Sequence, residues 1–191
     1  MKVLIAVHGF PPTHYAGGER AAERIALWLV GQGHQVEVFA PEKLDDPNTR
    51  VESSTENGMV VHRFYYDVKQ GDHFQNLYDD ARVGQAFRKL LESNTYDVLH
   101  VVSGYLLGGQ VIHTAREFGL PIVLTLTEFW FMCFRLNLLN AMNEMCVGPE
   151  SDDKCARCAL EDQRRFRLPA QQALSRDGCF LERSEICSLR P

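Results

Sequence analysis

Val3-Leu4-Ile5-Ala6-Val7 is the stretch that decides the fold, because it is a run of five apolar residues of which three are β-branched. A short, continuously apolar run is typical of a strand covered on both faces in a parallel sheet. Apolar residues then recur at helical spacing from Ala22 to Leu29, and an alternating stretch follows at 34–40. Strand, helix and strand fit into about forty residues, the size of one βαβ unit. We expect residues 3–7 to form the first and central strand.

The same alternation continues along the chain. Further elements are expected at 59–65 (strand), 77–91 (helix), 96–102 (strand), 106–118 (helix) and 121–126 (strand). The polar stretch 44–56 is expected to be a loop, from which Asn57-Gly58 leads into the next strand. This order predicts an α/β fold with a Rossmann-like, doubly wound, mostly parallel sheet. After Thr127 the sequence becomes aromatic and then cysteine-bearing, which predicts a small cysteine-rich insertion at 129–160.

Composition limits the classes of function. The chain has 191 residues, of which 45% are hydrophobic and 24% charged, as in an ordinary soluble domain. Its net charge of -5 gives no global attraction to nucleic acid, so no nucleic-acid partner is expected. No apolar stretch approaches the length of about 18 residues that a membrane helix needs, and the apolar run 3–7 is too short for the core of a signal peptide. A cytoplasmic location is the default expectation.

Several segments together resemble the N-terminal domain of family 4 glycosyltransferases, which have the two-Rossmann fold called GT-B. The segments that carry the resemblance are Phe10-Pro11-Pro12 with Gly17-Gly18-Glu19, Gly33-His34-Gln35-Val36, Tyr96-Asp97-Val98-Leu99-His100, and 124–130. The cysteine-bearing segment looks like an insert found in one subset of these enzymes. The resemblance covers residues 1–165, and residues 166–191 form a tail with little family likeness.

The resemblance implies retaining transfer of a hexose-like sugar from a nucleotide diphosphate to a hydroxyl acceptor. A glycan, a lipid-linked sugar or a small molecule would be the acceptor, as in the synthesis of cell-envelope polysaccharide. In the family, the C-terminal GT-B domain holds most of the donor and the N-terminal domain holds the acceptor. The chain is therefore expected to be inactive without such a partner domain, and an exposed sheet edge would favour a homodimer. The alternative is a non-catalytic α/β ligand-binding module with a structural metal.

Gly17-Gly18 precedes the first helix, where free N–H groups and the helix dipole favour an anion. In the family this loop faces the donor diphosphate and the acceptor, although a Gly-Gly pair also suits a tight turn. The loop does not match Gly-x-Gly-x-x-Gly, which disfavours a nicotinamide enzyme. Three further binding candidates are Glu19 in the first helical turn, His14 in the glycine loop and Ser103 after the fourth strand. Glu19 also suits the dipole, and Ser103 also suits a helix N-cap.

Thr127 and Glu128 stand where the fifth strand opens into the expected cleft, the usual ligand position in an open α/β sheet. Many family members carry His-Asp here, so Thr127 departs from the pattern for a catalytic histidine. Glu128 is a candidate for orienting an acceptor hydroxyl, or it caps a helix that begins near Phe129. The family is thought to use the donor phosphate as its base, so no protein base is required. Thr127 and Glu128 are the catalytic candidates.

Four cysteines gather in the insertion, at Cys133, Cys146, Cys155 and Cys158. A Cys-x-x-Cys pair with a second pair from a hairpin is a ligand set for structural zinc or another thiophilic metal. The wide spacing of the first pair differs from common zinc ribbons, so reduced thiols and a disulfide stay open. Four thiolates leave no open coordination position, so such a zinc would be structural.

Four basic residues lie beside or after Cys158, the last cysteine of the insertion, on an expected helix. They suit a phosphate-bearing acceptor or peripheral contact with the inner face of the membrane, or they are a solvated face balanced by Glu161 and Asp162. The residues are Arg157, Arg164, Arg165 and Arg167.

Overall fold

The chain was studied as a computed structural model, which describes residues 1–43, 48–67, 76, 79–140 and 142–161. It divides into two compact units. Unit 1 comprises Met1–Val68 and Leu77–Thr127, and unit 2 comprises Lys69–Asn76 and Glu128–Pro191. The expected tail, Cys179 and Cys187, and most of the basic residues after the insertion lie outside the described residues.

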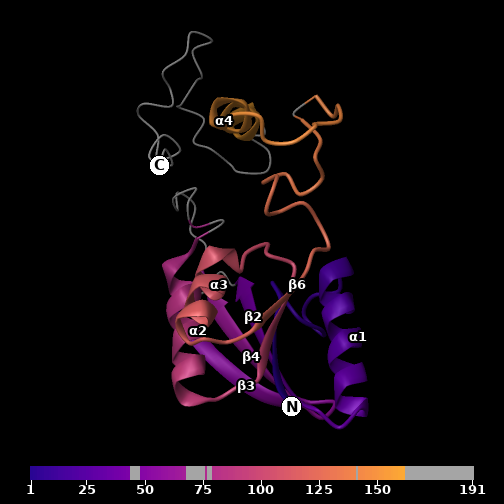
Figure 1. Cartoon of the computed structure of the whole chain (residues 1–191), viewed down its shortest axis with the longest axis vertical. Helices are drawn as coiled ribbons and strands as arrows, with labels where there is room; N and C mark the ends of the chain where they lie inside the picture. The colour runs from indigo at the N-terminus through magenta and orange to yellow at the C-terminus, as the bar shows by residue number, and fades with distance from the viewer. Residues whose placement is uncertain (44–47, 68–75, 77–78, 141, 162–191) are drawn as a thin grey trace. The chain divides into compact units, whose positions relative to one another are not determined.

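Unit 1 is a layered α/β unit around a six-stranded sheet with the strand order β3-β4-β2-β1-β5-β6. Strand β1 pairs in parallel with β2 on one side and with β5 on the other, as expected of a central strand. In Figure 1, α1 covers one face of the sheet and α2 and α3 cover the other. The predicted Rossmann-like, mostly parallel fold is confirmed. The elements of unit 1 are β1 (Lys2–Ala6), α1 (Gly17–Gly31), β2 (Gln35–Lys43), β3 (Arg50–Glu56), β4 (Met59–Tyr66), α2 (Ala81–Ser93), β5 (Val98–Val102), α3 (Gly108–Glu117) and β6 (Ile122–Thr125).

The apolar run at the N-terminus contributes side chains to the hydrophobic core on both faces of this sheet. Leu4 packs into a cluster with side chains of α2 and α3, among them Phe87. Val3 and Ile5 belong to a second cluster, which includes Ala22 of α1. Side chains alternate across a strand, so one buried strand joins both cores. This burial holds β1 at the centre of the sheet and fixes the position of its carboxyl end.

Strand β3 was not expected, because residues 44–56 suggested a loop. It pairs antiparallel with β4 at the edge of the sheet, and Asn57 and Gly58 form the hairpin turn with φ values of 49° and 82°. Nearly all of its side chains are exposed. An exposed edge strand buries no apolar face, so its sequence carries no alternating hydrophobic signal.

Strand β2 continues beyond Pro41, where the sequence suggested that it would end. The last β2 residue that pairs with β1 is Phe39, whereas pairing with β4 continues to Lys43. A proline is tolerated on a strand edge that lacks a neighbour, because no ladder partner needs its missing N–H. The strand can therefore pass through Pro41.

The described part of unit 2 contains one helix, α4 (Asp152–Glu161), after a segment of turns. The helix expected near Phe129 is absent from the described residues, and that expectation was wrong. A single turn forms instead, in which the N–H groups of Met132 and Cys133 donate to the Phe129 carbonyl. Leu136 and Leu138 then adopt φ values of 70° and 53°, which a right-handed helix cannot accommodate.

Candidate functional site

The carboxyl ends of β1 and β5 form the topological switch point of the sheet. The chain runs from β1 through α1 to β2 on one side, and β5 lies on the other side of β1. The connections therefore leave in opposite directions, which places the expected ligand crevice of an open α/β sheet beyond these two strand ends. In open α/β sheets ligands bind at this place. His8 follows β1 and Ser103 follows β5.

Gly18, at the start of α1, lies close to residues at these strand ends. A Cβ atom added to Gly18 would lie 3.3 Å from His8 Cε1, 3.5 Å from Thr127 Oγ1 and 3.7 Å from Ser103 Cβ. The start of α1 therefore meets residues that follow three different strands. Gly17 differs, since a Cβ added there would meet nothing within 4 Å. Of the adjacent glycines, Gly18 is the one whose missing side chain keeps the crevice open.

Helix α1 presents its N-terminus at this crevice without a side-chain cap. Its N-cap residue is Ala16, which provides no side-chain hydrogen bond. The first N–H groups of a helix have no partner within the helix, and the positive end of the helix dipole lies there. Such a terminus favours phosphate or another anion.

Glu19 and His8 form a buried pair beside Gly18. His8 Nε2 lies 3.2 Å from Glu19 Oε1, and the Glu19 residue is 3% exposed. The second carboxylate oxygen, Oε2, has no hydrogen-bond partner among the described residues. The ring of Tyr105 stands edge-on to His8 at 5.3 Å between centroids. His8 was not among the site residues predicted from the sequence, although its position after the first apolar strand was the available signal.

Ser103 is fully buried, with a φ of 69° that non-glycine residues rarely adopt. Its N–H donates to the Thr125 carbonyl at 3.0 Å, and its hydroxyl accepts from the Tyr105 N–H at 3.3 Å. It does not cap α3, which begins at Gly108 after the N-cap residue Leu107. Strained backbone of this kind costs about 1–3 kcal/mol and persists where surrounding structure enforces it, often at functional sites.

A buried network of hydrogen bonds and ion pairs stabilises the loop between β1 and α1. Nη2 of Arg63 donates to the Pro11 carbonyl at 2.6 Å, and Nε donates to Glu42 at 3.1 Å. The Thr13 hydroxyl donates to the same Glu42 oxygen at 2.7 Å. Arg63 also pairs with Glu56 of β3, and this hydrogen bond is the main cause that raises the pKa of Arg63 and lowers that of Glu56. Sequence reasoning missed this network, because charged residues in alternating strands usually face solvent.

His14, an acceptor-contact candidate, lies in the same loop and is half-buried. Its Nδ1 lies 3.2 Å from the Thr13 hydroxyl. The imidazole covers Gly9, where an added Cβ would come within 2.9 Å of His14 Cγ. Gly9 has a φ of 150°, so a side chain there would be strained as well as crowded.

The two catalytic candidates fall in different units. Thr127 closes unit 1 and lies beside Gly18, as described above. Glu128 opens unit 2 and is half-buried. The suggested helix cap at Glu128 is wrong, because a single turn and not a helix begins at Phe129. Catalytic roles for both residues stay predictions.

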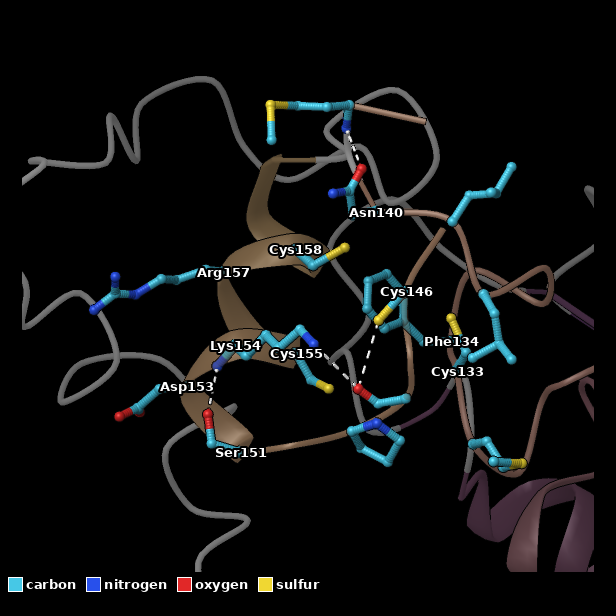
Figure 2. Close-up of a pocket in the computed structure, with 16 residues that line it drawn as sticks. Cys133, Phe134, Asn140, Cys146, Ser151, Asp153, Lys154, Cys155, Arg157 and Cys158 are labelled. Atoms are coloured by element: carbon cyan, nitrogen blue, oxygen red, sulfur yellow. Dashed lines mark hydrogen bonds between the residues drawn. The ribbon is translucent and has the colours of Figure 1, made fainter. Parts of the chain in front are cut away.

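All four cysteines of the insertion line one cavity of about 480 Å³ in unit 2 (Figure 2). Each is half-buried, and no disulfide joins them to one another. Burial raises the pKa of the Cys155 thiol, and the charges of the three other cysteines raise it further. Within the described ranges, no group of three or more His, Cys, Asp or Glu side chains stands in metal-binding geometry. Arg157 on α4 is exposed.

Comparison with known proteins identifies the family. Residues 16–177 match the family described as glycosyl transferase 4-like domain. The chain belongs to this family. The match begins immediately before the Gly17-Gly18 pair and includes α1, β5 and all four cysteines of the insertion, whereas β1 precedes it. A comparison with curated proteins gave no match.

Solved structures similar to this glycosyl transferase 4-like domain share low identity with it. The C-terminal domain of a hydrogenase from Pyrococcus furiosus is 19% identical, with a TM-score of 0.43 over 65% of this chain and 90% of that one. An E. coli trehalose-6-phosphate structure bound with UDP-2-fluoro glucose is 14% identical, with a TM-score of 0.44 over 65% and 32%. Trehalose-6-phosphate synthase OtsA is 14% identical, with a TM-score of 0.39 over 65% and 33%. This chain thus spans about a third of the latter two structures.

No helix among the described residues is long and apolar enough to cross a membrane.

Proposed function

We propose that unit 1 is the acceptor-side half of the active site of a retaining glycosyltransferase that uses a nucleotide-diphosphate sugar. The observation that carries this proposal is the crevice beside Gly18, at the switch point of a glycosyl transferase 4-like domain. The uncapped start of α1 supports a diphosphate ligand, because it offers N–H groups and positive potential.

Each residue of the crevice has a proposed task in transfer. The N–H groups at Gly17 and Gly18 hold the donor diphosphate, and Ser103 and Thr127 hydrogen-bond acceptor hydroxyls. Glu19 and His8 are placed at the base of the crevice, where the second Glu19 oxygen is buried without a hydrogen-bond partner among the described residues and would accept from an acceptor hydroxyl. His14 and Glu128 are proposed to contact the acceptor from the loops.

The reaction exchanges one bond to the anomeric carbon for another. The bond from this carbon to the donor phosphate breaks, and a bond to the acceptor oxygen forms on the same face of the sugar. The proton of the acceptor hydroxyl passes to the leaving phosphate, which becomes part of the released nucleoside diphosphate. The chain's own contribution is positioning and electrostatic stabilisation.

A matched pair of glycine substitutions tests the crevice. Gly18→Val is expected to weaken the binding of a nucleoside diphosphate at least tenfold, because its side chain would occupy the space beside His8 and Thr127. Gly17→Val is expected to leave the affinity within about threefold, since its Cβ meets nothing within 4 Å. Binding of UDP and GDP to the labelled full chain would be followed by NMR, with the largest shifts expected at the Gly17–Glu19 amides.

The pair controls for helix propensity, because both changes place valine in the first turn of α1. Equal affinity of the two variants would contradict the assigned crevice. So would chemical-shift changes confined to residues outside it.

We propose that turnover needs a C-terminal GT-B domain that binds the nucleotide-sugar. This chain alone is therefore expected to bind without transferring sugar from a panel of nucleotide-sugars. Turnover by this chain alone would contradict the donor-site assignment, and binding without turnover in the presence of the second domain would favour a non-catalytic module. A glycan or lipid-linked acceptor at the cytoplasmic membrane surface, peripheral membrane contact and a homodimer stay predictions.

A further inference from the structure

The described residues of unit 2 bury little apolar surface. Both hydrophobic clusters found in the described chain consist of unit 1 residues, and Ala156 is the only described unit 2 side chain among the buried apolar ones. Met142, Met145 and Val147 are 73%, 86% and 83% exposed. Small units without an apolar core usually depend on disulfides or a bound metal. No disulfide joins the four described cysteines to one another, so such bonds do not stabilise the described part of unit 2.

Three separate segments bring these thiols to one cavity. Cys155 and Cys158 are three residues apart on α4 and therefore share a helix face. Figure 2 shows both side chains pointing from α4 towards the segment that carries Cys146, whereas Arg157 and Asp153 point away from it. No other described site in the chain gathers four thiols.

Cys146 and Cys133 are held in place by backbone hydrogen bonds. The N–H of Cys146 donates to the Leu138 carbonyl at 2.7 Å, next to an antiparallel bridge between Leu139 and Met145. The side chain of Asn140 accepts from two backbone N–H groups and so closes this hairpin. The N–H of Cys133 donates to the Phe129 carbonyl at 2.6 Å. The backbone therefore presents both thiols without help from an apolar core.

We propose that Cys133, Cys146, Cys155 and Cys158 bind one zinc ion, which stabilises unit 2. Four thiolates suit the tetrahedral coordination of structural zinc and leave no position for substrate. Each thiol loses its proton on binding, so one zinc displaces about four protons at neutral pH. The sulfur atoms must move inwards to reach it, since none of the described groups already has metal-binding geometry.

Lys154 supports the same assignment from outside the cluster. Its ammonium donates to the Gly148 carbonyl at 3.3 Å and lies 3.0 Å from Glu150. The Cys146 thiol donates to the same Gly148 carbonyl at 3.5 Å, so the ammonium lies beside this thiol. A zinc ion with four thiolates carries excess negative charge, which a neighbouring cation and hydrogen bonds to sulfur offset.

Metal analysis of the full chain purified from zinc-supplemented cells tests the proposal. About one zinc per chain is expected, and Cys→Ser at any of the four positions is expected to reduce the zinc content at least tenfold. The double variant Cys179→Ser/Cys187→Ser is the matched control and should keep its zinc. An iron-containing or metal-free wild-type chain would overturn the proposal, as would zinc retention by all four single variants.

A second measurement uses only the wild-type chain, so it does not depend on how the variants fold. Chelation should make residues 128–161 sensitive to protease while the circular dichroism of the unit 1 sheet persists. Cobalt added to the stripped chain should give the intense visible bands of tetrahedral thiolate coordination. Calorimetry in buffers of different ionisation enthalpy should report the release of about four protons per zinc. Unchanged proteolysis after chelation, or weak octahedral cobalt bands, would contradict the proposal.

Discussion

Arg63→Met is expected to reduce the free energy of unfolding of unit 1 by about 3–5 kcal/mol, since removing one partner leaves a buried charge uncompensated. Glu42 is 3% exposed and would lose its guanidinium partner, although it would keep the Thr13 hydroxyl. The Pro11 carbonyl would lose its donor as well. Urea unfolding of the full chain, followed by circular dichroism, measures the change.

Arg50→Met is the matched control, because it removes the same group from an exposed pair. Arg50 and Glu52 are 40% and 57% exposed, and such pairs contribute about 0–1 kcal/mol. The double variant Arg63→Met/Glu42→Leu should recover part of the loss, because it removes the stranded carboxylate. A loss below about 1 kcal/mol for Arg63→Met would show that the network does not support the loop.

The same network predicts a pH dependence. The hydrogen bond from Arg63 keeps the pKa of Glu56 below its ordinary value of 4.5. A carboxylate whose pKa is lowered in the folded state stabilises the fold above its unfolded pKa, and this contribution disappears as the pH falls through the folded pKa. The stability difference between the wild-type chain and Arg63→Met should therefore be constant near neutral pH and decrease below about pH 4.5. A difference that grows on acidification would contradict this assignment.

Phe39→Ala is expected to cost about 3–5 kcal/mol, because it leaves a large cavity in the core of unit 1. The side chain is 1% exposed, stacks on Phe64 at 6.4 Å and meets Phe87 edge-on at 5.2 Å, between ring centroids. These contacts join β2 and β4 to α2, so the substitution would weaken the packing of α2 on the sheet. Urea unfolding again provides the measurement.

Trp28→Ala is the control for removing an aromatic ring from unit 1. Trp28 lies on α1 and is 62% exposed, so its loss should change stability by no more than about 0.5 kcal/mol. Equal losses for the two variants would show that the aromatic cluster does not dominate the core.

The sequence alone determined the architecture of unit 1. The apolar run at 3–7 could only be buried on both faces, and the spacing of the following helix and strand required a parallel βαβ unit. Hydrophobic periodicity depends on neighbours in the chain, so it is readable without coordinates. The same reasoning missed β3, because an exposed edge strand is stabilised by backbone pairing and needs no apolar pattern.

Only the tertiary structure decided which residues meet. Gly17 and Gly18 are equivalent in sequence, yet only Gly18 faces His8 and Thr127, because α1 is set against the ends of three strands. The sequence pattern suggests that Arg63 and Glu42 face solvent, but both are buried in the structure, where Arg63 donates to the Pro11 carbonyl. The four cysteines were visible as a pattern, and their common cavity depends on how a hairpin and α4 fold together. These pairings join residues that are distant in the chain, so packing and not local sequence selects them.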